Sequence, residues 1–199
     1  MKYYYLTFLF LSTLLFISFS LVSAQDIKDE NEKSINREDM PTSSLAEINR
    51  FWNKEKKVDF YRQNNGEMIS YEAKLEWNGH QYSIEFDSEG SLVNVEQLID
   101  FKDIPDASQN TITEELSKQY TRFRFTRIQR QYSAEEADDR DEILEDVIDE
   151  DYEDLIIRFE IVVDAQNKAV MGSFEWLFDE QGNMIQKRRI VRRSLDNIW

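Results

Sequence analysis

The chain has 199 residues, no cysteine and a formal net charge of −16 at neutral pH. Without cysteine it can form no disulfide, thiolate metal site or cysteine nucleophile. Its acidity makes nucleic acid and anionic membrane surfaces poor partners, while its length is sufficient for a hydrophobic core.

The first 24 residues have the pattern of a signal peptide. Lys2 supplies a positive charge, an apolar run extends over residues 6–21, and residues 22–24 are small enough for a signal peptidase site. We expect cleavage before Gln25 and export to the periplasm or the extracellular space. The alternative is an uncleaved membrane anchor, but the run is short and no basic cluster follows it.

Residues 25–39 are polar and charged, which predicts a disordered linker. The two stretches that follow, 40–100 and 101–193, read as copies of one another. Each opens with one of the two prolines, Pro41 or Pro105, and continues with a helix and alternating apolar strands. The sequence therefore predicts an α+β fold, a tandem repeat of helix plus antiparallel strands with the helices on one face of the sheet.

Local signals place the elements within these stretches. Ser44 and Glu47 have the spacing of a capping box at a helix start. Asn78-Gly79 is the strongest short signal for a hairpin, because both turn positions need positive φ. Phe86 and Phe178 are expected in equivalent buried positions, each in a strand that ends at a glycine-containing turn.

The segment 134–154 interrupts the second stretch and holds thirteen carboxylates and one arginine. Its like charges oppose compact packing, so we expect a solvated loop that is dispensable for folding, although Leu144 and Val147 lie on one helical stripe. Residues 194–199 form a short C-terminal tail. The basic residues 187–189, 192 and 193 are expected to lie near the acidic segment and offset its charge.

The ordered set of motifs resembles a known family. A Pro-led helix, an aromatic strand, Tyr71-x-Ala73-x-Leu75, Asn78-Gly79 and the run from Tyr82 to Asp87 are similar to the exported PepSY-like domains, also described as beta-lactamase-inhibitor-like periplasmic proteins. The resemblance implies a noncatalytic module whose curved sheet binds or inhibits a partner protein. It transfers no functional residue, because the family has no invariant catalytic motif.

Catalytic and metal-binding patterns are weak. His80 is the only histidine and stands beside a turn, and no phosphate-binding glycine loop is present. Asp149 and Glu160 fit the first and last ligand positions of a calcium loop, but Asp154 replaces the required glycine. We therefore expect no enzyme activity and no cofactor, with weak, non-specific calcium binding by the acidic segment as an alternative.

Strand alternation also identifies a candidate binding face. Ile156, Val162, Met171 and Leu177 fall on the side of the sheet that helices do not cover, where the first stretch has only polar residues. We predict a protein-binding site there, unless the acidic segment or the tail residues Leu195, Ile198 and Trp199 fold over it. The alternative function is a structural or cation-binding envelope protein that acts through the acidic segment.

Overall fold

The computed structural model describes residues 26–29, 31–52, 57–65, 68–136 and 139–191. The expected signal peptide, its cleavage site and the C-terminal tail lie outside these residues. None of the helices within them is long and apolar enough to cross a membrane. The strands are β1 (Asp26–Asp29), β2 (Asn31–Ile35), β3 (Val58–Asn65), β4 (Met68–Trp77), β5 (His80–Phe86), β6 (Leu92–Leu98), β7 (Arg122–Ser133), β8 (Ile156–Gln166), β9 (Met171–Asp179) and β10 (Met184–Val191). The α-helices are α1 (Thr42–Phe51), α2 (Asp106–Gln119) and α3 (Ile143–Asp149), and the 3-10 helices are η1 (Arg37–Asp39) and η2 (Phe101–Asp103).

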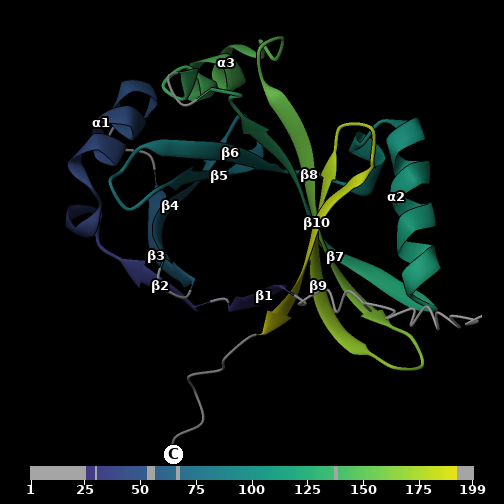
Figure 1. Ribbon diagram of the computed structural model, residues 1–199. Helices are drawn as coiled ribbons and strands as arrows, with labels where there is room; N and C mark the ends of the chain where they lie inside the picture. Colours follow the sequence, from purple (N-terminus) through teal and green to yellow (C-terminus); the bar gives the residue numbers. More distant parts are fainter. Residues whose placement is uncertain (1–25, 30, 53–56, 66–67, 137–138, 192–199) are drawn as a thin grey trace, which may run out of the picture.

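All ten described strands belong to one sheet, in the order β1-β10-β9-β8-β7-β6-β5-β4-β3-β2. Strands β2 to β10 pair antiparallel, whereas β1 pairs parallel with β10. β1 and β2 lie at opposite edges of the sheet, yet only residue 30 separates them along the chain. The sheet must therefore bend until its edges approach each other, and Figure 1 shows this curvature.

The predicted fold class, an α+β tandem repeat, is wrong. The described chain is one mostly antiparallel sheet with three α-helices, not a repeated helix-plus-strand arrangement. β6 pairs directly with β7, with Leu98 opposite Gln129, across the expected boundary between the two units. Local patterns locate strands, but they do not show that backbone hydrogen bonds will continue from one group of strands to the next.

The N-terminal segment is also different from the prediction. Residues 25–39 were expected to form a disordered linker, but they contain β1, β2 and η1. Ile35 pairs with Phe60 of β3 and packs against the core. The prediction relied on the scarcity of large apolar side chains, whereas an edge strand is held mainly by main-chain hydrogen bonds, which any residue except proline can donate.

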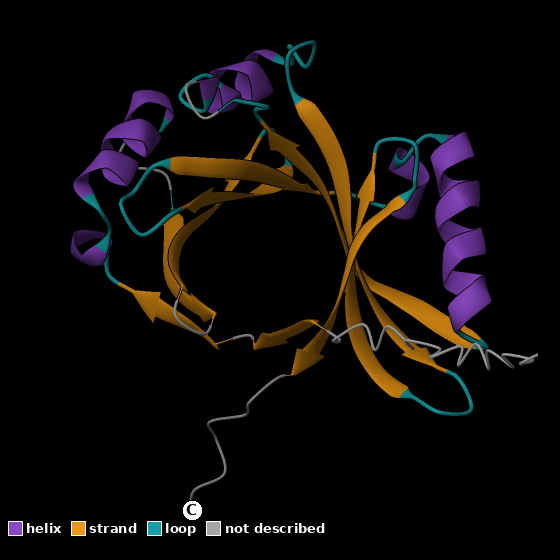
Figure 2. Ribbon diagram, viewed as in Figure 1, coloured by secondary structure: helices purple, strands orange, loops and turns teal. Residues whose placement is uncertain are grey.

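The apolar core lies between the helices and the outer, convex side of the sheet. One cluster gathers around α1 and α3 and includes Ile48 and Phe86, and a second lies against α2 and includes Leu116, Trp176 and Phe178. Phe86 and Phe178 are both fully buried, but they belong to different clusters. Figure 2 shows the three α-helices outside the curve of the sheet, so the inner face is formed by strands alone in the described part of the chain.

The acidic segment contributes to this core through α3. Ile143, Leu144 and Val147 are 0%, 1% and 3% exposed, and they pack in the first cluster, with α3 in contact with β6 and β7. On the outer side of the helix, Glu145 forms an ion pair with Arg50 at 3.2 Å. The expectation of a dispensable loop is wrong because a strongly charged helix can still bury one apolar stripe, and here the stripe outweighs the repulsion between like charges.

Two turns hold the helices against the sheet. Gly90 and Gly182 have φ of +88° and +85°, and a Cβ on Gly182 would lie 2.7 Å from the carbonyl oxygen of Ser108. Ser108 donates a hydrogen bond to the Glu180 carbonyl at 2.6 Å. Ser44, expected to cap α1, instead donates to the Gly90 carbonyl at 3.2 Å, because the helix begins earlier, directly after Pro41.

Candidate functional site

The candidate site is the concave face of the sheet, which no described helix covers. Along β4, Ala73 and Leu75 belong to the core, whereas Glu72 and Lys74 alternate with them and point to the other side. The same alternation in the neighbouring strands lines the concave face with polar side chains. Those that are almost completely buried are Glu72, Ser83, Asn94, Glu96, Gln129, Ser133, Glu160 and Glu175.

Two arginines and two glutamates cross-link strands β7 to β10 on this face. Arg127 lies 3.0 Å from Glu160 and 3.8 Å from Glu175. Arg188 forms an ion pair with Glu175 and lies 3.9 Å from Glu160. Both glutamates are at most 5% exposed, so their desolvated charges depend on the two guanidinium groups.

Glu96 in β6 is one of these buried polar side chains, and Arg127 and Glu160 of the cross-link lie close to it. Its carboxylate accepts hydrogen bonds from Gln129 at 2.7 Å and from Gln131 at 3.1 Å. Burial raises the pKa of Glu96 well above its ordinary value, and the negative charges of Glu160 and Glu85 raise it further. Glu96 therefore keeps its proton to a higher pH than an exposed glutamate does.

Lys74 is the cation on the other half of the concave face. It forms ion pairs with Glu32 at 2.8 Å and with Glu72 at 3.1 Å. Burial by itself lowers the pKa of Lys74, but the hydrogen bond and charge of Glu32, together with Glu72, outweigh burial and raise it. On both halves of the concave face, buried carboxylates therefore have cationic partners. These ion pairs offset the cost of removing the charges from water.

Two depressions meet at Leu98, the last residue of β6: one extends toward η2, and the other extends over β4 and β5. Their volumes are about 860 Å³ and 520 Å³, and Leu98 and Arg127 line both. Leu98 is 40% exposed, and the stacked rings of Phe101 and Phe125, with centroids 4.4 Å apart, line the larger depression. An exposed apolar side chain, aromatic rings and an arginine together are typical of protein-binding surfaces.

The predicted partner-binding residues do not form one exposed patch. Met171 is 76% exposed, Val162 is 3% exposed, and Ile156 and Leu177 are half-buried. All four alternate with core residues along β8 and β9, so they lie on the helix-free face. Ile156 begins β8, however, whereas Met171 pairs with Gln166 at the other end of that strand. A role for these residues in partner binding stays a prediction.

Sequence reasoning missed Leu98 and Arg127. A β-bulge between Phe125 and Arg127 shifts the alternation of β7. Counting every second residue from Phe123 and Phe125 would place Arg127 in the core, but the bulge turns it to the concave face. Leu98 carried no signal in the sequence, because a single apolar residue at the end of a strand is common on protein surfaces.

The other candidate chemistries gain no geometric support. His80 is exposed in β5 and lines the larger depression, beside the Asn78-Gly79 turn, whose two residues have the predicted positive φ. Asp149 ends α3, whereas Glu160 is buried in β8, so the suggested calcium loop does not form. Within the described residues, no three histidine, aspartate or glutamate side chains are arranged to hold a metal ion.

The basic residues 187–189, 192 and 193 were expected to offset the charge of the acidic segment. Residues 192 and 193 lie outside the described residues, and Lys187 and Arg188 make their contacts elsewhere. Lys187 lies over the rings of Tyr120, Phe174 and Trp176, at 4.9, 5.0 and 4.8 Å from their centroids. Burial lowers the pKa of Lys187. Lys187 therefore contacts the end of α2, whereas Arg188 pairs with Glu175 on the concave face of the sheet.

Comparison with known proteins finds a likeness of fold. No family model and no curated protein matches the chain. A DUF2874 family protein from Bacteroides ovatus ATCC 8483 is 12% identical, with 75% of this chain and 87% of that chain covered, at a TM-score of 0.51. A BLIP-like protein from Bacteroides fragilis NCTC 9343 is 12% identical, with coverages of 80% and 92%, at a TM-score of 0.47. A protein from Bacteroides eggerthii DSM 20697, assigned provisionally to the periplasm, is 10% identical, with coverages of 75% and 88%, at a TM-score of 0.47.

The likeness to the DUF2874 family protein, at a TM-score of 0.51, supports a shared fold. The resemblance to the PepSY-like, beta-lactamase-inhibitor-like group stays a prediction. At 12% identity the likeness concerns the fold alone and transfers no partner and no residue role.

Proposed function

We propose that the protein is an exported, noncatalytic module that binds a partner protein through the helix-free face of its sheet. The observation that carries the proposal is the one-sided placement of the helices. They cover the convex face, and the concave face ends in two depressions that share the exposed Leu98 and the cation Arg127. Export is supported by the apolar run over residues 6–21.

The shape and chemistry of this surface favour a protein as the partner. The polar side chains of the concave face are held in fixed positions by ion pairs and hydrogen bonds, so little ordering is needed on binding. The accessible groups at its edge are a leucine, stacked phenylalanines and an arginine, which suit an apolar anchor surrounded by polar contacts.

Quantitative affinity capture tests the proposal. The mature chain, from Gln25 onward, is immobilised beside two variants, Leu98→Asp and Met68→Asp, and exposed to native periplasmic extract. Leu98 lines both depressions, whereas Met68 is 70% exposed at the start of β4 and lines neither. We expect a specific protein to be retained by the parent chain and by Met68→Asp, and to be lost with Leu98→Asp.

The thermal unfolding midpoint of each variant controls for loss of folding. A protein captured equally by all three chains would show that binding occurs elsewhere, and it would contradict the proposal. Titration of the purified partner with the module, followed by the partner's own activity, then decides whether binding inhibits it.

A further inference from the structure

A third depression, of about 480 Å³, lies between the ends of β7, β8 and β9 and away from Leu98 and Arg127. Its lining combines basic, apolar and small residues: Arg122, Phe123, Arg124, Asp164, Ala165, Gln166, Met171, Gly172 and Ser173. It is of the size that accepts one or two side chains of a ligand.

The positive charge of this depression is available for binding. Arg122 is exposed, and its guanidinium group makes no hydrogen bond or ion pair with the residues that the structure describes. Arg124 pairs with Asp164 at 2.8 Å, but its side chain is 77% exposed, so that ion pair is weak. Arg189 lies beside Gly172, since its guanidinium nitrogens would be 3.6 Å from a Cβ there, and it adds a further charge at this end.

Met171 provides the accessible apolar part of the depression. Met171 is 76% exposed, and strand pairing places it in one row with Gln166 and Arg122. Phe123 is half-buried, with its ring edge-on to that of Phe125 at 5.6 Å. The flexible, exposed side chain of Met171 can adapt to different apolar side chains.

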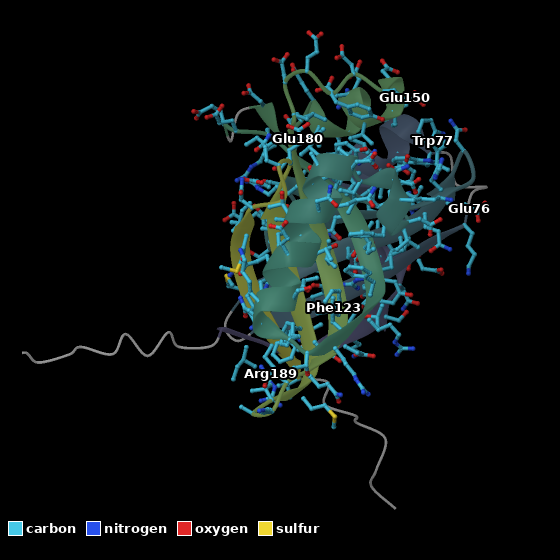
Figure 3. All side chains as sticks on the ribbon, turned by 90° about the vertical axis from the view of Figure 1, so that its right-hand side faces the viewer. Glu76, Trp77, Phe123, Glu150, Glu180 and Arg189 are labelled. Carbon is cyan, nitrogen blue, oxygen red and sulfur yellow. The ribbon has the colours of Figure 1, made fainter. Side chains whose placement is uncertain are left out.

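The charges of the molecule are separated along its length. Figure 3 shows Glu150 of the acidic segment at the upper end of the view, and Phe123 and Arg189 toward the lower end. Arg122, Arg124 and the nearby Arg189, against the single Asp164, give this end a local excess of positive charge that suits a small negatively charged ligand.

We propose that this depression binds an extended, acidic–apolar segment of a protein partner. An apolar side chain of the segment packs against Met171, and neighbouring carboxylates pair with Arg122 and Arg124, which lie on the same face of the sheet as Met171. The planar guanidinium group of arginine suits such carboxylates, because it can donate two parallel hydrogen bonds. The site does not depend on binding at Leu98, so each proposal can fail without the other.

Two other ligands fit the observations less well. The acidic segment of a second copy of this chain has the right charge, but its apolar residues Ile143, Leu144 and Val147 are buried in its own core. An anionic membrane surface would meet the basic end, but the negative charge of the whole chain opposes that approach.

The test titrates the mature chain with a blocked synthetic hexapeptide in which aspartates flank a leucine–phenylalanine pair. Labelling the methionine methyl groups with carbon-13 gives separate signals, so Met171 reports on the site and the exposed Met68 serves as an internal control. We expect the Met171 signal to shift and the Met68 signal to stay, with saturation below about 1 mM peptide. A peptide with lysines in place of the aspartates should cause no shift.

Matched variants complete the test. Arg122→Glu should weaken peptide binding at least about tenfold, because it removes a charge-assisted hydrogen bond and adds a repulsion. Lys33→Glu makes the same change in charge at an exposed position of β2 and should leave binding unchanged. Absence of a Met171 shift, or equal affinity of the two variants, would overturn the proposal. Binding of dodecanoate or of phosphatidylglycerol vesicles without binding of the peptide would also overturn it, as would concentration-dependent self-association that Arg122→Glu abolishes.

Discussion

Truncation of the buried face of α3 should destabilise the whole protein, even though α3 belongs to the most acidic part of the chain. Leu144 is 1% exposed and packs in the cluster that also contains Phe86 and Tyr132. Leu144→Ala removes its apolar contacts and leaves a cavity beneath the helix. Glu145→Ala is the matched control, because Glu145 is the next residue in the same helix and its side chain is 55% exposed.

The expected magnitude follows from burial. A fully buried leucine replaced by alanine costs about 2–5 kcal/mol of the free energy of unfolding. For a domain of this size, each kcal/mol lowers the midpoint of thermal unfolding by roughly 2–4 °C, so Leu144→Ala should lower it by about 4–20 °C. Glu145→Ala removes only an exposed ion pair with Arg50 and should cost less than about 1 kcal/mol.

Urea unfolding followed by tryptophan fluorescence, with thermal unfolding by circular dichroism, measures both variants. Replacement of residues 135–152 by a short glycine-containing turn should be more damaging than Leu144→Ala, since it removes Ile143 and Val147 as well. If Leu144→Ala costs less than about 1 kcal/mol, or if the replacement leaves the midpoint unchanged, α3 is not part of the core and the reasoning fails.

Three further predictions concern the concave face, the turns and calcium. Because the pKa of Glu96 is raised in the folded state, stability should fall as pH rises from the ordinary glutamate range through the raised value, and Glu96→Gln should flatten this dependence in urea unfolding at pH 5 and pH 8. A flat profile in the parent chain would argue against a protonated Glu96. Gly182→Ala should cost about 2–3 kcal/mol by calorimetry, since its Cβ meets the Ser108 carbonyl, whereas Gly79→Ala, which meets nothing within 4 Å, should cost only about 1–2 kcal/mol of backbone strain. Equal costs would contradict this account. Calcium at about 1 mM should raise the thermal midpoint by less than about 2 °C, because no described carboxylates are arranged as a ligand set; a larger rise would restore the cation-binding alternative.

The candidate site could be predicted from the sequence only in outline. Strand alternation correctly placed Ile156, Val162, Met171 and Leu177 on the face without helices, because side chains alternate strictly along a regular strand. It could not show that Val162 is buried there, since that depends on the bend of the whole sheet. Nor could it find Arg127, whose direction is set by a bulge that the local pattern does not reveal.

Several elements were determined by neighbouring residues alone. The Asn78-Gly79 turn forms as predicted because those two residue types tolerate positive φ. Both long helices begin directly after Pro41 and Pro105, the residues that open the two stretches, although the capping-box spacing had placed the start of α1 at Ser44. In each case the cause is a steric or hydrogen-bonding preference that acts within a few residues.

The tertiary structure decided what these elements become. Pairing of β6 with β7 made one continuous sheet, and the N-terminal residues became its two edge strands, although their composition indicated disorder. Glu96 and Gln129, 33 residues apart in the chain, meet in a buried hydrogen bond that no local pattern predicts. Burial and strand pairing depend on residues that are distant in sequence, and so the buried polar side chains of the concave face follow from the bend of the whole sheet.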